Sequence, residues 1–470
     1  MESFNKIDAY VATVQDQIRC RKIRSYVTEE IRVHLEEERS FLLEAGITDP
    51  EATDTAIKEM GDPVDIGVKL DRIHRPRMDW FLYFGVVALC LVGFLIQFLI
   101  RSDGTGSQFT PLYRHLTGIL IGIAAMTLIC RLDFTLLSKH PYIIWTAYWI
   151  GLFIYSDFAP KYNGRTITLL PYMLLFIPLF AGLVYSTRGS GYGGLLKNLL
   201  FLLLPGILCL IIPSASASAL VIGGCLILMS IAICKNWFRV KRGWALLCSW
   251  SICVIPLILL LYNNGGYRFR RLQVLLHPSA YADNEGYMIM KLRGLIGQAS
   301  MIGGLSNSEI VKNLPEISTD YLLSYVIIHF GWIPAAVLIA LLAAFLIHLF
   351  RLSARQTNAL GYLVSMACSC TLTLEILLYL IVNLGIFHMA PLALPFFSYG
   401  GRWMVLNLCI VGLLLSVHRT RTILPAGRLH QTSISHRFFT FENGRLNIRC
   451  LPITLYAEKH THEEKNDHRF

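Results

Sequence analysis

The sequence predicts an all-α, polytopic membrane protein with about ten transmembrane helices, preceded by a small soluble helical domain. Three observations point to this fold class. Hydrophobic residues make up 54% of the 470-residue chain and charged residues only 16%, a balance that is unusual for a soluble protein of this length. Apolar runs near the roughly 20 residues that span a bilayer recur between residues 79 and 418. The first 78 residues, in contrast, are polar.

Residues 1–78 are expected to form a cytosolic helical domain. A helix is expected over residues 28–45, with Thr28 as its N-cap and the glycine that follows as its stop. A second helix is expected over residues 48–61, where a proline stands in the first turn. A third is expected after Asp62-Pro63 and leads toward the membrane.

Ten apolar segments are expected to cross the membrane within residues 79–418. They lie at about 79–100, 116–131, 140–158, 166–186, 195–212, 218–234, 243–263, 320–350, 358–384 and 401–417. The eighth segment is long, which predicts a tilted helix or one that extends beyond the bilayer.

Lysine and arginine residues in the short loops predict the orientation of these spans in the cell membrane. With a cytosolic amino terminus, ten of them lie inside and five outside. The inner ten are Arg131, Lys139, Arg188, Lys197, Lys235, Arg239, Lys241, Arg242, Arg351 and Arg355, and the outer five are Arg101, Arg114, Lys161, Arg165 and Arg402. Both termini are therefore expected in the cytoplasm, with residues 419–470 as a polar tail. The long loop at about 264–319 would face outside, and such loops are usually functional.

Asp320 is a carboxylate at an expected membrane–water boundary, directly before the eighth span. One interpretation is a helix N-cap, in which Thr319 or Asp320 satisfies free N–H groups at the start of that span. The other is chemistry on a molecule carried by the membrane. A second carboxylate, Glu375, lies inside the ninth span, where it is a functional candidate by default or a hydrogen-bonded structural residue.

Two motifs resemble the SEDS family (FtsW, RodA, SpoVE). They are Leu314-Pro315-Glu316-x-x-Thr319-Asp320 and Leu394-Pro395-Phe396-Phe397-Ser398-Tyr399-Gly400-Gly401. They stand before the third-last and last spans, and the resemblance runs from about residue 79 to 420. Residues 28–63 resemble the permease-prefix (HAAS-type) domain, which implies an interaction or regulatory module. The SEDS resemblance implies a ten-span glycosyltransferase that polymerises lipid II into peptidoglycan.

Asp320 matches the catalytic aspartate of that family. Glycan polymerisation needs a base near the sugar hydroxyl and positive charge near the leaving pyrophosphate. The resemblance therefore implies that Asp320 is the general base or, alternatively, a ligand of a divalent cation such as Mg²⁺ or Mn²⁺. No dedicated protein metal site is predicted. Arg271 would contact the pyrophosphate, with Arg268 and Lys291 as weaker candidates; alternatively, these loop cations contact lipid head groups.

Ser398, Tyr399, Gly400 and Gly401 are expected to form a tight backbone turn near the site, either as part of a substrate-binding surface or as a purely structural turn. The implied partners are lipid II, a class B penicillin-binding protein and the membrane. No stretch of interleaved basic and aromatic residues points to nucleic acid.

The chain differs from the family at several positions. Ser318 stands where the family has a histidine, and Arg402 and Trp403 stand where it has serines. The resemblance is thus to a divergent member. Two further interpretations remain: a non-enzymatic relative that binds lipid-linked precursor or a partner, and a lipid flippase.

Overall fold

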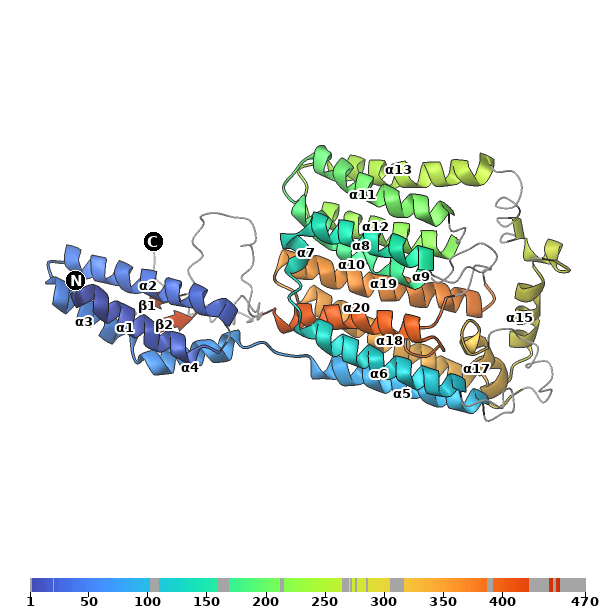
Figure 1. Ribbon diagram of the computed structural model, residues 1–470, viewed down its shortest axis with the longest axis horizontal. Coiled ribbons are helices and arrows are strands. Elements are labelled where there is room, and N and C mark those ends of the chain that lie inside the picture. The colour runs from blue at the N-terminus through green and yellow to red at the C-terminus, as the bar shows by residue number, and fades with distance from the viewer. Residues whose placement is uncertain are drawn as a thin grey trace, which may run out of the picture. The chain divides into compact units, whose positions relative to one another are not determined.

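The computed structural model in Figure 1 describes most of the chain. The described residues are 2–19, 21–101, 110–158, 169–211, 215–263, 270, 273–274, 277–284, 286–304, 317–386, 392–421, 439–442 and 445–448. The chain divides into two compact units. The first comprises Met1–Pro76 with Gly427–Phe470, and the second comprises Arg77–Ala426.

Four helices make up the amino-terminal part of the first unit: α1 (Glu2–Gln17), α2 (Arg21–Glu44), α3 (Asp49–Met60) and α4 (Pro63–His74). The starts of α3 and α4 match the predictions. Thr28, however, lies inside α2, where its hydroxyl donates to Arg24 O at 2.7 Å, so the expected N-cap there was wrong. The helix α1 was missed, although Ile7, Val11 and Val14 repeat at helical spacing and are buried.

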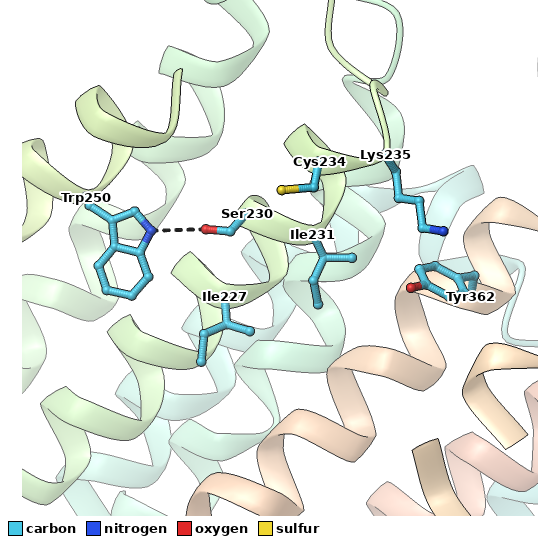
Figure 2. A pocket seen from close by; sticks show the side chains of 7 residues that line it. All are labelled: Ile227, Ser230, Ile231, Cys234, Lys235, Trp250 and Tyr362. Atoms are coloured by element: carbon cyan, nitrogen blue, oxygen red, sulfur yellow. Dashed lines mark hydrogen bonds between the residues drawn. The ribbon is translucent and has the colours of Figure 1, made fainter. Parts of the chain in front are cut away.

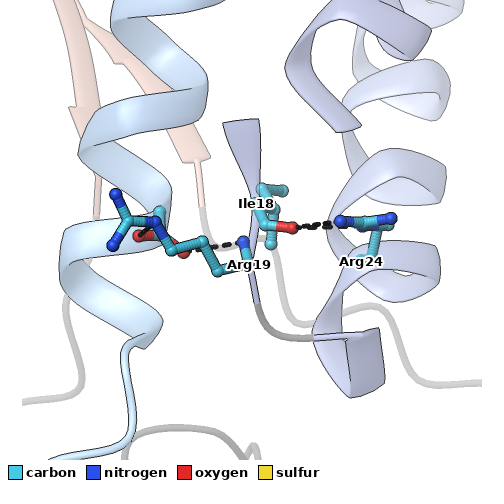
Figure 3. Close-up of polar contacts among 4 residues, drawn as sticks. Ile18, Arg19 and Arg24 are labelled. Atoms are coloured by element: carbon cyan, nitrogen blue, oxygen red, sulfur yellow. Dashed lines mark hydrogen bonds and ion pairs between the residues drawn. The ribbon is translucent and has the colours of Figure 1, made fainter. Parts of the chain in front are cut away.

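Polar contacts hold the ends of these helices together (Figure 3). Arg24 donates to Ile18 O from Nε at 3.1 Å and from Nη2 at 2.8 Å. The backbone N–H of Arg19 donates to Asp71 Oδ1 at 2.9 Å, which joins the end of α1 to α4. Tyr10 donates its hydroxyl to Gly61 O at 2.9 Å, and burial raises the pKa of Tyr10.

The first unit also contains a β-hairpin, β1 (Phe439–Glu442) and β2 (Arg445–Ile448), paired antiparallel with Phe439 opposite Ile448. The composition of residues 419–470 predicted only a polar tail here. An Asn-Gly dipeptide at residues 443–444 separates two short alternating runs in the sequence. That pattern is a strong hairpin signal and would have predicted the two strands.

The second unit is a helical bundle, and the predicted all-α polytopic class is confirmed. Its helices are α5 (Trp80–Ile100), α6 (Thr110–Arg131), α7 (Leu136–Lys139), α8 (Pro141–Phe158), α9 (Leu170–Leu174), α10 (Phe176–Ser186), α11 (Tyr192–Ile211), α12 (Ala215–Cys234), α13 (Arg242–Asn263), α15 (Tyr287–Gly297), α17 (Leu322–Phe330), α18 (Trp332–Ala354), α19 (Ala359–Asn383) and α20 (Gly401–Arg419), with a short 3-10 helix at Pro278–Tyr281. In Figure 1 the long helices run side by side, and α15 lies across one end of them.

Each of the ten predicted spans falls on one helix or on two consecutive helices. Within the described residues, five helices are long and apolar enough to cross a membrane: Trp80–Ile100, Leu112–Arg131, Trp332–Ala354, Ala359–Asn383 and Gly401–Arg419. Three shorter apolar helices accompany them at Pro171–Ser186, Tyr192–Pro205 and Leu220–Cys234. The unit is therefore a multi-pass membrane domain.

The eighth predicted span is not one continuous helix but is broken into two. Helices α17 and α18 are separated at Gly331, whose φ of +99° favours glycine. The N–H groups of Trp332 and Ile333 donate to Ser300 O at 3.1 Å and Met301 O at 3.0 Å. These loop carbonyls replace the helical acceptors that a continuous span would use, so α18 starts afresh after Gly331.

Helix α20 packs closely and in parallel along α6. Three glycines allow the close approach: Gly118 meets Gly401, Gly122 meets Leu408, and Gly412 meets Met126. Small residues are typical where two membrane helices come into backbone contact. The contact between α6 and α20 fixes the start of α20, and with it the position of the loop that carries the second motif.

Candidate functional site

Backbone hydrogen bonds fix the residues that lead into Asp320. Ser318 O accepts from Gln97 Nε2 on α5 and from the N–H of Tyr399, both at 2.8 Å. Thr319 O accepts from Ser398 Oγ at 2.7 Å. Asp320 O accepts from Asn383 Nδ2, at the end of α19, at 2.9 Å. Three successive carbonyls are thus held by three other parts of the second unit, and the backbone that carries Asp320 has a defined position.

The second motif forms a tight turn at residues 394–398, whereas the sequence predicted one at residues 398–401, of which Gly401 already begins α20. Ser398 Oγ accepts from the N–H of Leu394 at 2.8 Å, and the N–H of Ser398 donates to Leu394 O at 3.1 Å. Gln97 Nε2 also donates to Phe397 O at 3.1 Å. One glutamine on α5 therefore bonds both motifs, which are about 80 residues apart in sequence.

The contacts of Ser398 favour a positioning role. Its side chain is buried, and its hydroxyl is occupied by Leu394 N and Thr319 O. The predicted substrate contact by this hydroxyl finds no support in that geometry. The backbone N–H of Tyr399 is likewise used, on Ser318 O.

Gly400 has a structural reason to be glycine, because its φ is +153°. Gly401 begins α20 against α6, and this close approach needs a glycine at residue 118, where a Cβ would stand 2.8 Å from Gly401 Cα. Of the two interpretations left open for the turn, this geometry favours the structural one.

The N-cap interpretation of Asp320 was wrong. Helix α17 begins with Tyr321 as its N-cap residue. The N–H groups that a capping side chain would take are those of Leu323 and Ser324. They donate instead to Tyr379 Oη at 3.3 Å and to Asn383 Oδ1 at 3.2 Å, both on α19. Capping of α17 therefore does not explain the presence of a carboxylate at residue 320.

Asn383 is the residue at this site that sequence reasoning missed most clearly. It is fully buried, and its amide donates to Asp320 O and accepts from Ser324 N and from Ser324 Oγ. Gln97 on α5 is also buried, and its amide donates to the backbone of both motifs, at Ser318 O and Phe397 O. Both are amides in otherwise apolar helices, a pattern that marks functional candidates in membrane spans.

The loop cations are only partly described. Arg268 and Arg271 lie outside the described residues. Lys291 lies on α15, half-buried, with Nζ 5.6 Å from the centre of the Tyr287 ring. On the same helix, Arg293 donates from Nε to Gly385 O at 2.6 Å and from Nη2 to Ile386 O at 3.2 Å. Arg293 was not singled out in the sequence, since its partners are more than 90 residues away.

His115 is a further buried polar residue close to the second motif. It lies on α6 with its ring 6.0 Å from that of Tyr399 and 6.4 Å from that of Phe94. Neither ring nitrogen has a hydrogen-bond partner among the described residues. The ring therefore fills the space behind Tyr399 and supports the turn by packing.

Glu375 is hydrogen-bonded within the bundle. It is fully buried on α19, and its Oε1 accepts from Asn407 Nδ2 of α20 at 3.1 Å. Its other oxygen and Asn407 Oδ1 have no partner among the described residues. This arrangement favours the structural interpretation of Glu375.

A carboxylate on a fixed backbone can accept a proton from an incoming hydroxyl or can bind a cation. Asp320 is half-buried, so part of the residue remains accessible from the surroundings of the bundle. Within the described residues, no group of three or more His, Cys, Asp or Glu side chains converges as a metal site.

Comparison with known proteins shows which family the sequence matches. The profile of the FtsW/RodA/SpoVE family, described as "Cell cycle protein", matches residues 77–423. A relative from Trichlorobacter lovleyi is 23% identical over 74% of this chain and 94% of its own length. Another, from Thioalkalivibrio sulfidiphilus, is 26% identical over 76% of this chain and 93% of its own. Both are named "Probable peptidoglycan glycosyltransferase FtsW".

Two solved structures show the same fold. A chain from a study titled "Structural coordination of polymerization and crosslinking by a peptidoglycan synthase complex" has a TM-score of 0.57 at 22% identity. The matched region covers 73% of this chain and 98% of the chain from that study. The rod shape determining protein RodA of Thermus thermophilus has a TM-score of 0.51 at 18% identity, over 73% and 97% of the two chains.

Proposed function

The chain belongs to the FtsW/RodA/SpoVE family of cell cycle proteins, and from that premise we propose that it is a peptidoglycan glycosyltransferase that polymerises lipid II into glycan strands. The relatives named as probable peptidoglycan glycosyltransferases support this activity. The observation that carries the proposal is the set of hydrogen bonds to the backbone carbonyls of residues 318–320, because it supports a defined backbone position for the motif's aspartate.

In the proposed reaction, Asp320 is the general base. Its carboxylate accepts the proton of a sugar hydroxyl on one lipid-linked substrate. The hydroxyl oxygen forms a bond to the anomeric carbon of the other substrate, and the bond from that carbon to the pyrophosphate oxygen breaks. The lipid pyrophosphate leaves with the electron pair. A positioned base typically contributes about 10²–10⁴-fold to such a step, and the bonds to residues 318–320 keep Asp320 in place for it.

Positive charge near the leaving pyrophosphate is the second requirement. We assign it to the cations of the loop at about 264–319, with Arg271 first and Arg268 and Lys291 as weaker candidates. As the alternative to the general base, Asp320 would be a ligand of a divalent cation, Mg²⁺ or Mn²⁺, since Mg²⁺ is usually held by one or two carboxylates together with substrate phosphates. The cation would neutralise charge on the leaving group.

The proposal includes an orientation and partners. Lipid II reaches Asp320 at the outer surface when both termini are cytoplasmic, as the loop charges indicate. A class B penicillin-binding protein is the proposed partner, and the likeness to a chain of a peptidoglycan synthase complex supports it. The helices of residues 1–76 would form a permease-prefix-type module with an interaction or regulatory role.

The direct test supplies labelled lipid II to the purified full chain, alone and with a class B penicillin-binding protein. Glycan polymer is the expected product. Binding of lipid II without polymer under either condition would contradict the enzyme and favour a precursor-binding protein. Transfer of lipid II across reconstituted vesicles without polymer would favour a flippase.

A further inference from the structure

A shallow pocket of about 470 Å³ lies at the end of the second unit away from Asp320. Figure 2 shows its lining side chains, which come from α12, α13 and α19 and from the first residue after α12. They are Ile227, Ser230, Ile231, Cys234, Lys235, Trp250 and Tyr362. A volume of this size is within the range of small-molecule sites, which span about 300–1,000 Å³. We call it the α12 groove.

The floor of the α12 groove is apolar. Ile227, Ile231 and Cys234 repeat at helical spacing and so form one stripe along α12. Trp250 closes one side (Figure 2), and its indole N–H donates to Ser230 Oγ at 3.0 Å. That bond satisfies the indole donor of the wall, so the groove offers hydrocarbon and aromatic surface to an occupant.

The other side of the groove carries positive charge. Lys235 Nζ lies 5.3 Å from the centre of the Tyr362 ring, and Figure 2 shows both side chains on the side away from Trp250. Among the described residues, Lys235 forms no salt bridge. The sequence contains no acidic residue from 158 to 282, while the loop at residues 235–242 has four cations, Lys235, Arg239, Lys241 and Arg242.

Contacts with a neighbouring loop keep these cations in place. The N–H of Gly189 donates to Trp237 O at 2.8 Å, and the N–H of Arg239 donates to Ser190 O at 3.0 Å. Arg242 Nε donates to Asn236 Oδ1 at 2.5 Å. The positive rim of the α12 groove is therefore part of an ordered surface.

The α12 groove lies about one bilayer thickness from Asp320. Tyr362 and Asn383 stand near opposite ends of α19, and Asn383 binds Asp320 O. The 21 residues between them correspond to about 31 Å of helix, close to the roughly 30 Å of a hydrocarbon core. The lysine- and arginine-rich rim thus belongs at the surface opposite Asp320, which the loop charges place on the cytoplasmic side.

We propose that the α12 groove binds an anionic phospholipid of the inner leaflet. One acyl chain lies along Ile227 and Ile231 against Trp250, and the phosphate lies at Lys235. Charge complementarity selects this occupant, because the four cations of residues 235–242 attract a net negative head group. Basic pockets between membrane helices on the cytoplasmic side are suited to such lipids. The site is separate from Asp320 and stands whether or not the glycosyltransferase proposal holds.

The first test measures head-group selectivity. The full-length protein is incubated in micelles with equal amounts of dioleoyl phosphatidylglycerol and dioleoyl phosphatidylcholine, and bound lipids are counted by native mass spectrometry. Phosphatidylglycerol is expected to be retained preferentially. Lys235→Ala should lower its retention about tenfold, the usual effect of one lost charge-assisted hydrogen bond. Lys139→Ala, an exposed cation at the same end of the unit, is the matched control and should leave retention unchanged.

The second test locates the acyl chain. Phosphatidylglycerol with brominated acyl chains quenches nearby tryptophans, and Trp250→Phe should remove part of the quenching seen in the wild-type protein. Equal retention of the two lipids, or equal retention by the Lys235 and Lys139 variants, overturns the head-group site. Unchanged quenching in the Trp250 variant overturns the acyl-chain position.

Discussion

Asn383 shows at the scale of one residue how this site is built. Its amide group bonds the carbonyl of Asp320 on one side and the first turn of α17 on the other. A buried amide that satisfies several backbone groups is costly to remove, because each partner then lacks a hydrogen bond in a dry interior. The side chain therefore fixes both the carboxylate's backbone and the helix that follows.

Asn383→Ala is expected to lower the polymerisation rate at least tenfold while lipid II binding stays near its wild-type level. The reason is that Asp320 loses its bond to α19 and its carboxylate is no longer held in one place. The loss of stability should be about 2–4 kcal/mol, since a buried donor and buried acceptors lose their partners. The measurement is polymer formed per folded molecule, with thermal unfolding in parallel.

The matched control is Asn407→Ala. It removes a buried amide of α20 that is bonded to Glu375 of α19, without touching residues 318–320. It should destabilise the bundle to a similar degree and leave the rate per folded molecule intact. If both variants lose the same activity, Asn383 has no special role at Asp320.

The sequence predicted part of this site and missed the rest for a physical reason. Asp320 and Ser398 were found because each belongs to a short motif. Asn383 and Gln97 belong to none, and their partners lie 63 and 221 residues away in the sequence. Only the fold brings them together, although an amide in an apolar run was a usable signal.

At the scale of elements, helix α5 positions the second motif by close approach. Gly93 faces the turn, and a Cβ there would collide with Phe396 O and stand 2.8 Å from Phe397 Cα. Gln97, one turn further along α5, bonds Phe397 O. The glycine and the glutamine together hold the turn that bonds residues 318 and 319.

Gly93→Ala should displace the turn at residues 396–397 and reduce polymerisation, at a cost of about 1–3 kcal/mol from overpacking. Gly85→Ala, on the same helix, is its control, because no atom lies within 4 Å of a Cβ built there. That change should be neutral or slightly stabilising, since alanine favours helix over glycine by about 1 kcal/mol. Thermal unfolding and polymer yield distinguish the two. If Gly93→Ala and Gly85→Ala have the same thermal stability and polymer yield, close packing at Gly93 does not position the turn.

The elements themselves were predictable where hydrophobic length decided them. All ten predicted segments fall on helices, because about 20 apolar residues favour a membrane-spanning helix. The break at Gly331 was missed, because glycine within an apolar run also occurs in continuous membrane helices. What ends α17 there is the loop at residues 300–303, whose carbonyls take the N–H groups of α18.

At the scale of the whole molecule, the proposals depend on which surface faces the cytoplasm. The loop charges predict that Asp320 faces outside and the α12 groove faces inside. Each site then faces the leaflet that supplies its ligand: lipid-linked precursor outside and anionic phospholipid inside. The orientation is therefore shared by both proposals and can be tested independently of either.

Ser279→Cys and Arg239→Cys test this orientation in intact cells with a membrane-impermeant maleimide. Both positions are exposed, one in the short 3-10 helix before α15 and the other in the loop after α12. We expect labelling above the wild-type background at residue 279 in intact cells, and at residue 239 only after permeabilisation. The reverse pattern would place Asp320 on the cytoplasmic side and exclude polymerisation of lipid II at the outer surface.

The most direct test of the central claim is the polymerisation rate of Asp320→Asn with labelled lipid II, measured beside Asp283→Asn. Both changes replace a carboxylate by an amide of the same shape, and Asp283 is an exposed residue in the turn that follows the 3-10 helix. Asp320→Asn should bind lipid II and lose about 10²–10⁴-fold in rate, because the base is gone, whereas Asp283→Asn should match the wild type. A variant at 320 that polymerises as fast as the variant at 283 would contradict the assignment of Asp320 as the base.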